Sequence, residues 1–125
     1  MKDLTIKEAI VSPKALEKDS EVEKLDLVDC FAIQSFGAFQ GWESLTDVYF
    51  GTDITRIGNG AFRDCKNLTD VWFAITDEDK FIEIAEDAFW GCEKPITFHI
   101  FATAIKNKYL NNYAKKHGFR VVGMI

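Results

Sequence analysis

Three short apolar segments carry side chains that could act in acid–base chemistry. The segments TDVYF and TDVWF each contain one aspartate, Asp47 and Asp70, and the later segment TFHIF contains His99. Carboxylates and imidazoles are the groups that most often transfer protons in enzymes. A small hydrolase-like enzyme that uses Asp47, Asp70 and His99 is therefore one hypothesis. Such chemistry needs a pocket that excludes water, which a flat row of strands does not offer. We predict that the protein is not an enzyme.

The same segments are better suited to form a binding surface. Alternate side chains of a strand point to opposite faces of its sheet, so the residues between inward-pointing Val and Phe form columns on the outer face. The two expected columns are Asp26, Tyr49, Trp72, His99 and Lys24, Asp47, Asp70, Thr97. Exposed Tyr and Trp side chains are frequent anchors of protein interfaces. We therefore predict a protein partner bound by Tyr49, Trp72, His99, Asp47, Asp70 and Asp26.

Two other roles for this face stay open. Aromatic side chains on adjacent strands stabilise a sheet by about 0.2–1 kcal/mol per pair, so Tyr49 and Trp72 could serve packing alone. Asp47 and Asp70 would repel each other across adjacent strands, a cost that a basic or polar partner would relieve. Alternatively, the face could be buried against a second copy in a self-associating structural or adhesion module. The expected oligomeric state is a monomer or a weak homo-oligomer.

The sequence predicts no metal site and no cofactor. Cys30, Cys65 and Cys92 lack the spacing of a metal site, and no cysteine and histidine cluster occurs. Cys65 and Cys92 occupy a repeated position that Trp42 fills in an earlier copy, which indicates a position that selects apolar side chains. The acidic segment 75–80 lacks the glycine and the distal glutamate of a calcium loop. A phosphate loop and a dinucleotide motif are also missing from the sequence.

The residues of the outer columns lie in an internal repeat. The pair Ala-Phe occurs three times, 23 and then 27 residues apart, and each pair precedes a Trp or Cys and a short apolar strand. Periods in this range are typical of a solenoid with one parallel strand per repeat. In the first copy, Ile33 lies one residue away from the position that Ile57 takes in the second copy. We therefore expect a local irregularity at residues 31–37.

Both ends of the repeats are expected to be capped, because an open end exposes the core and an unpaired strand edge. Apolar residues among residues 4–19 predict one or two helical turns. Residues 1–22 are therefore interpreted as an N-terminal helical cap, and residues 23–101 as a solenoid of about three to four repeats.

Residues 102–125 are expected to form a C-terminal cap of one helix and one strand within the same single domain. Apolar side chains at helical spacing predict a helix that begins after Thr103 and ends at Gly118. Residues 119–122 then predict a strand. The fold class is thus α/β, with parallel short strands between two caps.

The repeat unit IGNGAFRDCKNLTDVWF resembles that of the BspA-like leucine-rich repeat family. The segments PITFHIF and YLNNYAKKHGFRVV resemble the helix and strand that close many members, and the resemblance covers residues 23–122. It implies a right-handed β/α solenoid that recognises proteins. Some members of the family are bacterial surface proteins that adhere to host matrix.

Composition and charge narrow the choice of partner and compartment. Residues 1–93 hold all 20 acidic residues, whereas residues 94–125 hold 6 basic residues and no acidic one. Six basic residues on an acidic protein do not form the broad basic face that nucleic acid requires, so no nucleic acid is expected. The sequence contains no apolar run of about 20 residues, and its N-terminus lacks the apolar core of a signal peptide. The expected location is therefore cytoplasmic by default, or the cell surface or exterior if a leader has been removed.

Overall fold

The computed structural model describes residues 2–7, 10–11, 21–34 and 36–124. In this part of the chain, short strands alternate with turns, and the helical elements lie near the C-terminal end. The elements are β1 (Lys2–Thr5), β2 (Ile10–Val11), β3 (Val22–Leu27), β4 (Ala32–Ile33), β5 (Asp47–Phe50), β6 (Arg56–Ile57), β7 (Asp70–Phe73), β8 (Glu83–Ile84), β9 (Thr97–Phe101), the 3-10 helix η1 (Ala102–Ala104), α1 (Lys108–His117) and β10 (Arg120–Met124).

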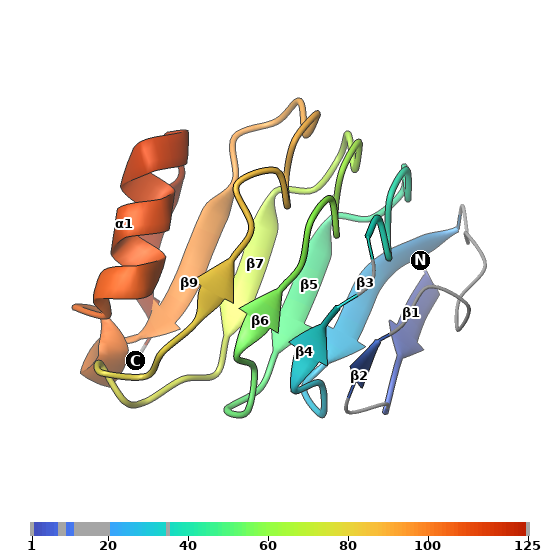
Figure 1. Ribbon diagram of the computed structural model, residues 1–125. Coiled ribbons are helices and arrows are strands. Elements are labelled where there is room, and N and C mark those ends of the chain that lie inside the picture. The colour runs from blue at the N-terminus through green and yellow to red at the C-terminus, as the bar shows by residue number, and fades with distance from the viewer. Residues whose placement is uncertain (1, 8–9, 12–20, 35, 125) are drawn as a thin grey trace.

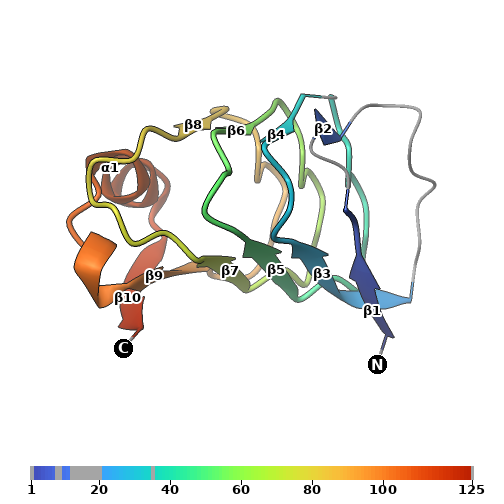
Figure 2. The same cartoon turned by 90° about the horizontal axis from the view of Figure 1, so that it is seen from below.

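The strands form two sheets, and from β1 to β9 consecutive strands alternate between them. The six-stranded sheet has the order β1-β3-β5-β7-β9-β10, and the four-stranded sheet has the order β2-β4-β6-β8. The strand pairs of the described residues are all parallel. Figures 1 and 2 show the sheets as two facing layers, with α1 beyond β8 at the C-terminal end. The prediction of short parallel strands in an α/β repeat fold is confirmed.

Phenylalanine rings stack along the core because the repeat places them at the same point of successive copies. The ring of Phe62 stacks on Phe39 and on Phe89, with centroids 5.4 Å apart in both pairs. Phe50 and Phe73 on adjacent strands also stack with centroids 5.4 Å apart. Neighbouring strands lie about 4.7–4.9 Å apart, so equivalent rings meet face to face. All five rings are buried, and the repeat thus builds a continuous core.

The expected N-terminal helical cap is wrong where the structure describes it. Lys2–Thr5 and Ile10–Val11 are strands, and β1 pairs with β3 so that Leu4 is the partner of Leu25. Leu4 packs against the core and Ile6 is buried in it, two positions later. This two-residue period suits a strand, and pairing with β3 outweighs the local helical preference. Residues 8–9 and 12–19 of the predicted helical segment lie outside the described residues.

The first repeat copy keeps its strand register. Ile33 is the Cα partner of Ile57, and Ile57 is the partner of Ile84. Ile33 therefore takes the same strand position as Ile57 and Ile84, although it lies one residue farther from its Ala-Phe pair. The additional residue of the first copy falls between Ile33 and Ala38, within the expected irregular segment.

The C-terminal helix begins later than predicted. Thr103 lies inside η1, whereas the Asn107 side chain caps α1 by accepting a hydrogen bond from the Leu110 N–H at 3.1 Å. The Asn107 amide also donates to the Lys80 carbonyl at 2.9 Å, which ties the start of the helix to the preceding repeat. Gly118 ends the helix in the left-handed conformation, as predicted, at φ 74°.

Candidate partner-binding face

The strand register brings the predicted aromatic column together on the outer face of the six-stranded sheet. It aligns one residue from each of β3, β5, β7 and β9, in the order Asp26, Tyr49, Trp72 and His99. The adjacent column contains Lys24, Asp47, Asp70 and Thr97. The structure therefore places all six predicted binding residues on one face. Their role in binding stays a prediction.

The three rings of the column form a continuous stack, here called the ring ladder (Tyr49, Trp72 and His99). The Tyr49 and Trp72 centroids lie 5.8 Å apart with an interplanar angle of 14°. The Trp72 and His99 centroids lie 3.7 Å apart at 9°. The Trp72 ring is therefore covered on both faces, whereas Tyr49 has a stacking partner only on its β7 side within this column.

The carboxylates of the neighbouring column hold the ladder in place. Asp47 Oδ2 accepts a hydrogen bond from Trp72 Nε1 at 3.1 Å, and Asp70 Oδ1 lies 2.7 Å from His99 Nε2. The hydroxyl of the preceding threonine donates to the other oxygen of each aspartate, from Thr46 at 2.7 Å and from Thr69 at 2.6 Å. Both oxygens of each carboxylate are thus satisfied within the chain. A basic partner is not required to explain why Asp47 and Asp70 lie on adjacent strands.

These hydrogen bonds also set the protonation of Asp70. Partial burial alone would raise the pKa of this carboxyl, but the hydrogen bonds from Thr69 and His99 and the charge of His99 lower the pKa below its usual value. At neutral pH Asp70 is therefore ionised and serves as an acceptor. A carboxylate of lowered pKa that is occupied by two internal donors is poorly placed to act as a general base.

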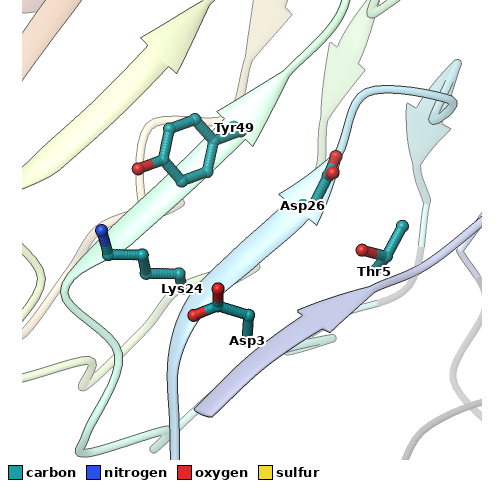
Figure 3. A pocket seen from close by; sticks show the side chains of 5 residues that line it. All are labelled: Asp3, Thr5, Lys24, Asp26 and Tyr49. Carbon is teal, nitrogen blue, oxygen red and sulfur yellow. The ribbon is translucent and has the colours of Figure 1, made fainter. Parts of the chain in front are cut away.

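A hollow of about 370 Å³ opens beside Tyr49, at the end of the ring ladder. The residues that line it come from β1, β3 and β5, and they are Asp3, Thr5, Lys24, Asp26 and Tyr49. Figure 3 shows their side chains around a common open space, with Lys24 on the side of the Tyr49 hydroxyl and Asp26 on the other side. Asp70 and His99 do not line this hollow, so it does not supply the pocket that the enzymatic hypothesis needs.

Asp3 and Thr5 were not among the predicted binding residues because their segment was expected to be part of a helical cap. In the structure Asp3 is the Cα partner of Lys24, and Thr5 is the partner of Asp26, so both outer columns extend by one strand. The signal that could have found them is the alternation of polar and apolar residues in KDLTI, which matches the alternation in EKLDL of β3.

The electrostatics of the hollow are mixed. Burial and then the negative charge of Asp47 raise the pKa of the Tyr49 hydroxyl, and Lys24 partly offsets this effect. The hydroxyl is therefore neutral at physiological pH and able to donate a hydrogen bond. Within the described residues, neither Asp3 nor Lys24 forms a side-chain hydrogen bond or an ion pair. Their charges therefore remain available to a ligand.

The rings of the ladder are half-buried, and more exposed aromatic side chains, which were not predicted as binding residues, lie away from it. Phe31 and Phe81 are 49% and 54% exposed, and they line a second hollow of about 250 Å³ beside β6. The ring of Phe81 also packs edge-on against Tyr109, with centroids 5.0 Å apart. Arg63 lies over the ring of exposed Trp90, with its guanidinium carbon 4.3 Å from the ring centroid.

Two cysteine thiols form hydrogen bonds with backbone carbonyl groups of the preceding repeat. Cys65 Sγ donates to the Phe39 carbonyl at 3.1 Å, and Cys92 Sγ donates to the Phe62 carbonyl at 3.3 Å. Burial raises the pKa of both thiols to about 12, so they are protonated at neutral pH. The repeated position therefore accepts an apolar side chain, as predicted, and in two copies also a weak hydrogen-bond donor.

The described residues lack both a metal-binding cluster and a membrane-spanning helix. This part of the chain has no group of three or more His, Cys, Asp or Glu side chains arranged to hold a metal ion. Its helices are too short and too polar to cross a membrane.

Comparison with known proteins identifies the repeat. No curated protein and no solved structure matches the chain significantly. The family model of the BspA type leucine rich repeat region matches residues 5–117 with six copies, where the sequence analysis counted about three to four. The match begins at the last residue of β1 and ends at the last residue of α1, so it includes β2, which lies in the segment that was expected to form a cap outside the repeats. The chain therefore belongs to the BspA-type leucine-rich repeat family, whose repeats generally mediate protein–protein interactions.

Proposed function

We propose that the protein is a non-catalytic interaction module that binds a partner protein on the outer face of its six-stranded sheet. The observation that carries the proposal is the ring ladder, which ends at Tyr49 beside an open hollow. The alternation of strands between the two sheets is interpreted as the turns of a right-handed solenoid. Such a solenoid presents an extended sheet surface to partners.

The chemistry of the face supports this role. Tyr and Trp side chains supply large contact areas and lose little conformational entropy, because each has only two side-chain torsions. Hydrogen bonds to Asp47 and Asp70 already hold Trp72 and His99, so this surface is ordered before a partner arrives. A preorganised surface binds more tightly because less ordering entropy is lost on association.

A comparison of the half-buried ring ladder with a pair of exposed rings tests the proposal. Wild-type protein, Tyr49→Ala/Trp72→Ala and the control variant Phe31→Ala/Phe81→Ala serve as baits for partners from cell extract and from extracellular-matrix extract. The control removes two exposed rings near the four-stranded sheet and leaves the ring ladder intact. Circular dichroism and thermal unfolding on all three proteins establish that each is folded.

The expected result is a protein retained by wild type and by the control but released by Tyr49→Ala/Trp72→Ala. Truncating two interface anchors should weaken binding at least about 30-fold, since each costs about 1–2 kcal/mol or more. If the folded ladder variant retains the partner and the control loses it, the partner binds on the side of the four-stranded sheet, and the proposal is contradicted. Equal retention by all three proteins would contradict a role for either aromatic face.

A further inference from the structure

The ring ladder ends where the next strand offers no ring. Trp72 is stacked on both sides, but the Cα partner of Tyr49 on β3 is Asp26, and the partner of Asp26 on β1 is Thr5. These shorter side chains leave the hollow of about 370 Å³ beside the Tyr49 ring. Figure 3 shows that open space between Tyr49, Asp26 and Thr5. A flat group of the partner could therefore extend the stack by one position.

The carboxylates that border this space keep at least one oxygen without a hydrogen-bond partner in the described residues, unlike those of the neighbouring column. Asp26 uses Oδ1 to accept the Val28 N–H at 3.0 Å, and its Oδ2 has no hydrogen-bond partner within the described residues. The Asp3 carboxylate forms no hydrogen bond or ion pair within these residues either. By contrast, Asp47 and Asp70 each use both oxygens in the chain. The acids available to a ligand are thus Asp3 and Asp26.

A guanidinium group fits these requirements better than the other common side-chain groups. It is planar and stacks on aromatic rings, and it carries a charge opposite to that of Asp3 and Asp26. Its fork of N–H groups can pair with a carboxylate through two hydrogen bonds. A neutral aromatic ring could stack on Tyr49, but it would remove water from the carboxylates without pairing them. A lysine ammonium would pair with the carboxylates but has no flat face to stack.

Lys24 shapes the hollow from the other side. Its positive charge acts on the Tyr49 hydroxyl, where it partly offsets the effect of burial and of Asp47. In Figure 3 the Lys24 ammonium lies on the hydroxyl side of Tyr49, away from Asp26. An incoming cation would therefore be placed toward Asp26 and away from Lys24. Removal of the Lys24 charge should strengthen binding of a cation.

We propose that this hollow binds an arginine side chain of the partner protein, with the guanidinium stacked on the open face of Tyr49 and paired with Asp26 and Asp3. The inference rests on the proposed function, because it specifies the chemistry of a partner that docks on the same face. It also replaces Asp47 and Asp70 by Asp26 and Asp3 as the residues that select a basic partner.

Titration with small probes tests the inference without knowledge of the partner. The probes are Nα-acetyl-arginine N-methylamide, its lysine analogue and its citrulline analogue, which keeps the planar shape of arginine but has no charge. Backbone amide shifts of the ¹⁵N-labelled protein report binding and its location. The arginine probe should shift the amides of Thr5, Asp26 and Tyr49, with an affinity about five-fold higher than that of either analogue.

Four variants assign the contacts. Asp26→Asn keeps the shape and the acceptor for the Val28 N–H but removes the charge, and it should weaken arginine binding about three- to five-fold. Tyr49→Leu should weaken binding by a similar factor, whereas Lys24→Gln should strengthen it about two- to three-fold. Asp53→Asn, which removes an exposed carboxylate outside the hollow, is the control for net charge and should have no effect.

Several results would overturn the inference. One is that the amide signals at the hollow do not shift at arginine-probe concentrations up to about 50 mM. Another is that the citrulline probe binds as tightly as the arginine probe. A third is that Asp53→Asn weakens arginine binding as much as Asp26→Asn does. Because the titration uses no partner, its failure leaves the proposed function standing if partner capture still depends on Tyr49 and Trp72. Arginine binding without a ladder-dependent partner would instead contradict the proposed function alone.

Discussion

At the scale of single residues, the same chemical unit occurs twice on the sheet face. In each unit a threonine hydroxyl and a ring on the next strand donate to opposite oxygens of one aspartate. Asp47 thereby holds the Trp72 ring, and Asp70 holds the His99 ring. Residues that resemble a catalytic acid–base set in the sequence therefore have a positioning role in the structure. The unit also explains how two adjacent carboxylates are tolerated, since each is stabilised by two donors.

The hydrogen bonds to Asp70 predict a pH-dependent contribution to stability. Its folded-state pKa lies below the unfolded value near 3.8, so the ionised carboxylate stabilises the fold above that pH and this contribution is lost as pH falls through the folded pKa. Asp70→Asn should lower the free energy of unfolding by about 1 kcal/mol at pH 7. The difference from wild type should shrink as the pH is lowered from 7 into the acidic range below 3.8. Urea unfolding across this range measures it.

The control for this prediction is Asp53→Asn, which removes one exposed carboxylate whose side chain forms no hydrogen bond among the described residues. Its difference from wild type should stay small at every pH. A difference for Asp70→Asn that is constant with pH would mean that the Asp70 charge does not contribute to stability.

At the scale of elements, each repeat makes a sharp turn before the position that holds Trp or Cys. The residue at this turn adopts positive φ in all three copies, at 74° for Gly41, 59° for Asp64 and 83° for Gly91. Only glycine adopts this conformation without steric cost. The middle copy therefore retains local strain at Asp64, the one non-glycine residue with positive φ among the described residues.

Replacement of Asp64 by glycine should stabilise the protein. Asp64→Gly removes the cost of positive φ for a residue with a Cβ, and the gain should be about 1 kcal/mol in the free energy of unfolding. The Asp64 carboxylate lies 3.9 Å from Arg63 Nε, and both side chains are over a third exposed, so little electrostatic stabilisation is lost. Thermal or urea unfolding of the variant measures the change.

Asp64→Ala is the matched control for the turn. It removes the same carboxylate but keeps a Cβ, and alanine is less tolerant of positive φ than aspartate, so it should not stabilise the protein. Equal stability of the glycine and alanine variants would show that side-chain contacts, and not backbone strain, determine the energy of this turn.

At the scale of the whole molecule, the charge of the outer sheet face opposes self-association through that face. The net charge is −5, and the outer sheet face carries four carboxylates, Asp3, Asp26, Asp47 and Asp70, which outnumber its cations Lys24 and, at the β10 edge, Arg120. Two copies that met through this face about a twofold axis would bring like charges together. Self-association through the ring ladder is therefore disfavoured relative to docking of a basic partner.

We accordingly predict a monomer in solution. Size-exclusion chromatography with light scattering should give a mass close to 14.2 kDa, at low salt and at about 150 mM salt alike. A dimer that appears only at the higher salt would indicate that charge repulsion holds the copies apart. A dimer that is lost in Tyr49→Ala/Trp72→Ala would favour the alternative in which the ladder is buried against a second copy.

Much of the repeat architecture could be read from the sequence because its signals are local and periodic. Alternation of apolar and polar residues along each strand separated the buried Val48 and Phe50 from the outward Asp47 and Tyr49. Repetition of the Ala-Phe pair placed equivalent residues on neighbouring strands, and the register confirms the column from Tyr49 to His99. A period-two pattern in a repeat leaves little freedom for register, since a shift of one residue would expose the core.

The sequence alone determined the parallel strands, the buried face and the order of the outer columns, because short-range periodicity specifies each of them, and its repeat motif resembles that of the family. Only the tertiary structure decided that residues 2–5 form a strand, since pairing with β3 outweighs the local helical signal. It also decided which carboxylates use both oxygens in hydrogen bonds within the chain and which keep an oxygen available to a ligand. That distinction depends on donors that lie 25 and 29 residues away in the chain, at Trp72 for Asp47 and at His99 for Asp70. The sequence repeats these residues but does not show which atoms pair. The hollow beside Tyr49 forms because β1 pairs with β3 and places Asp3 and Thr5 beside Lys24 and Asp26.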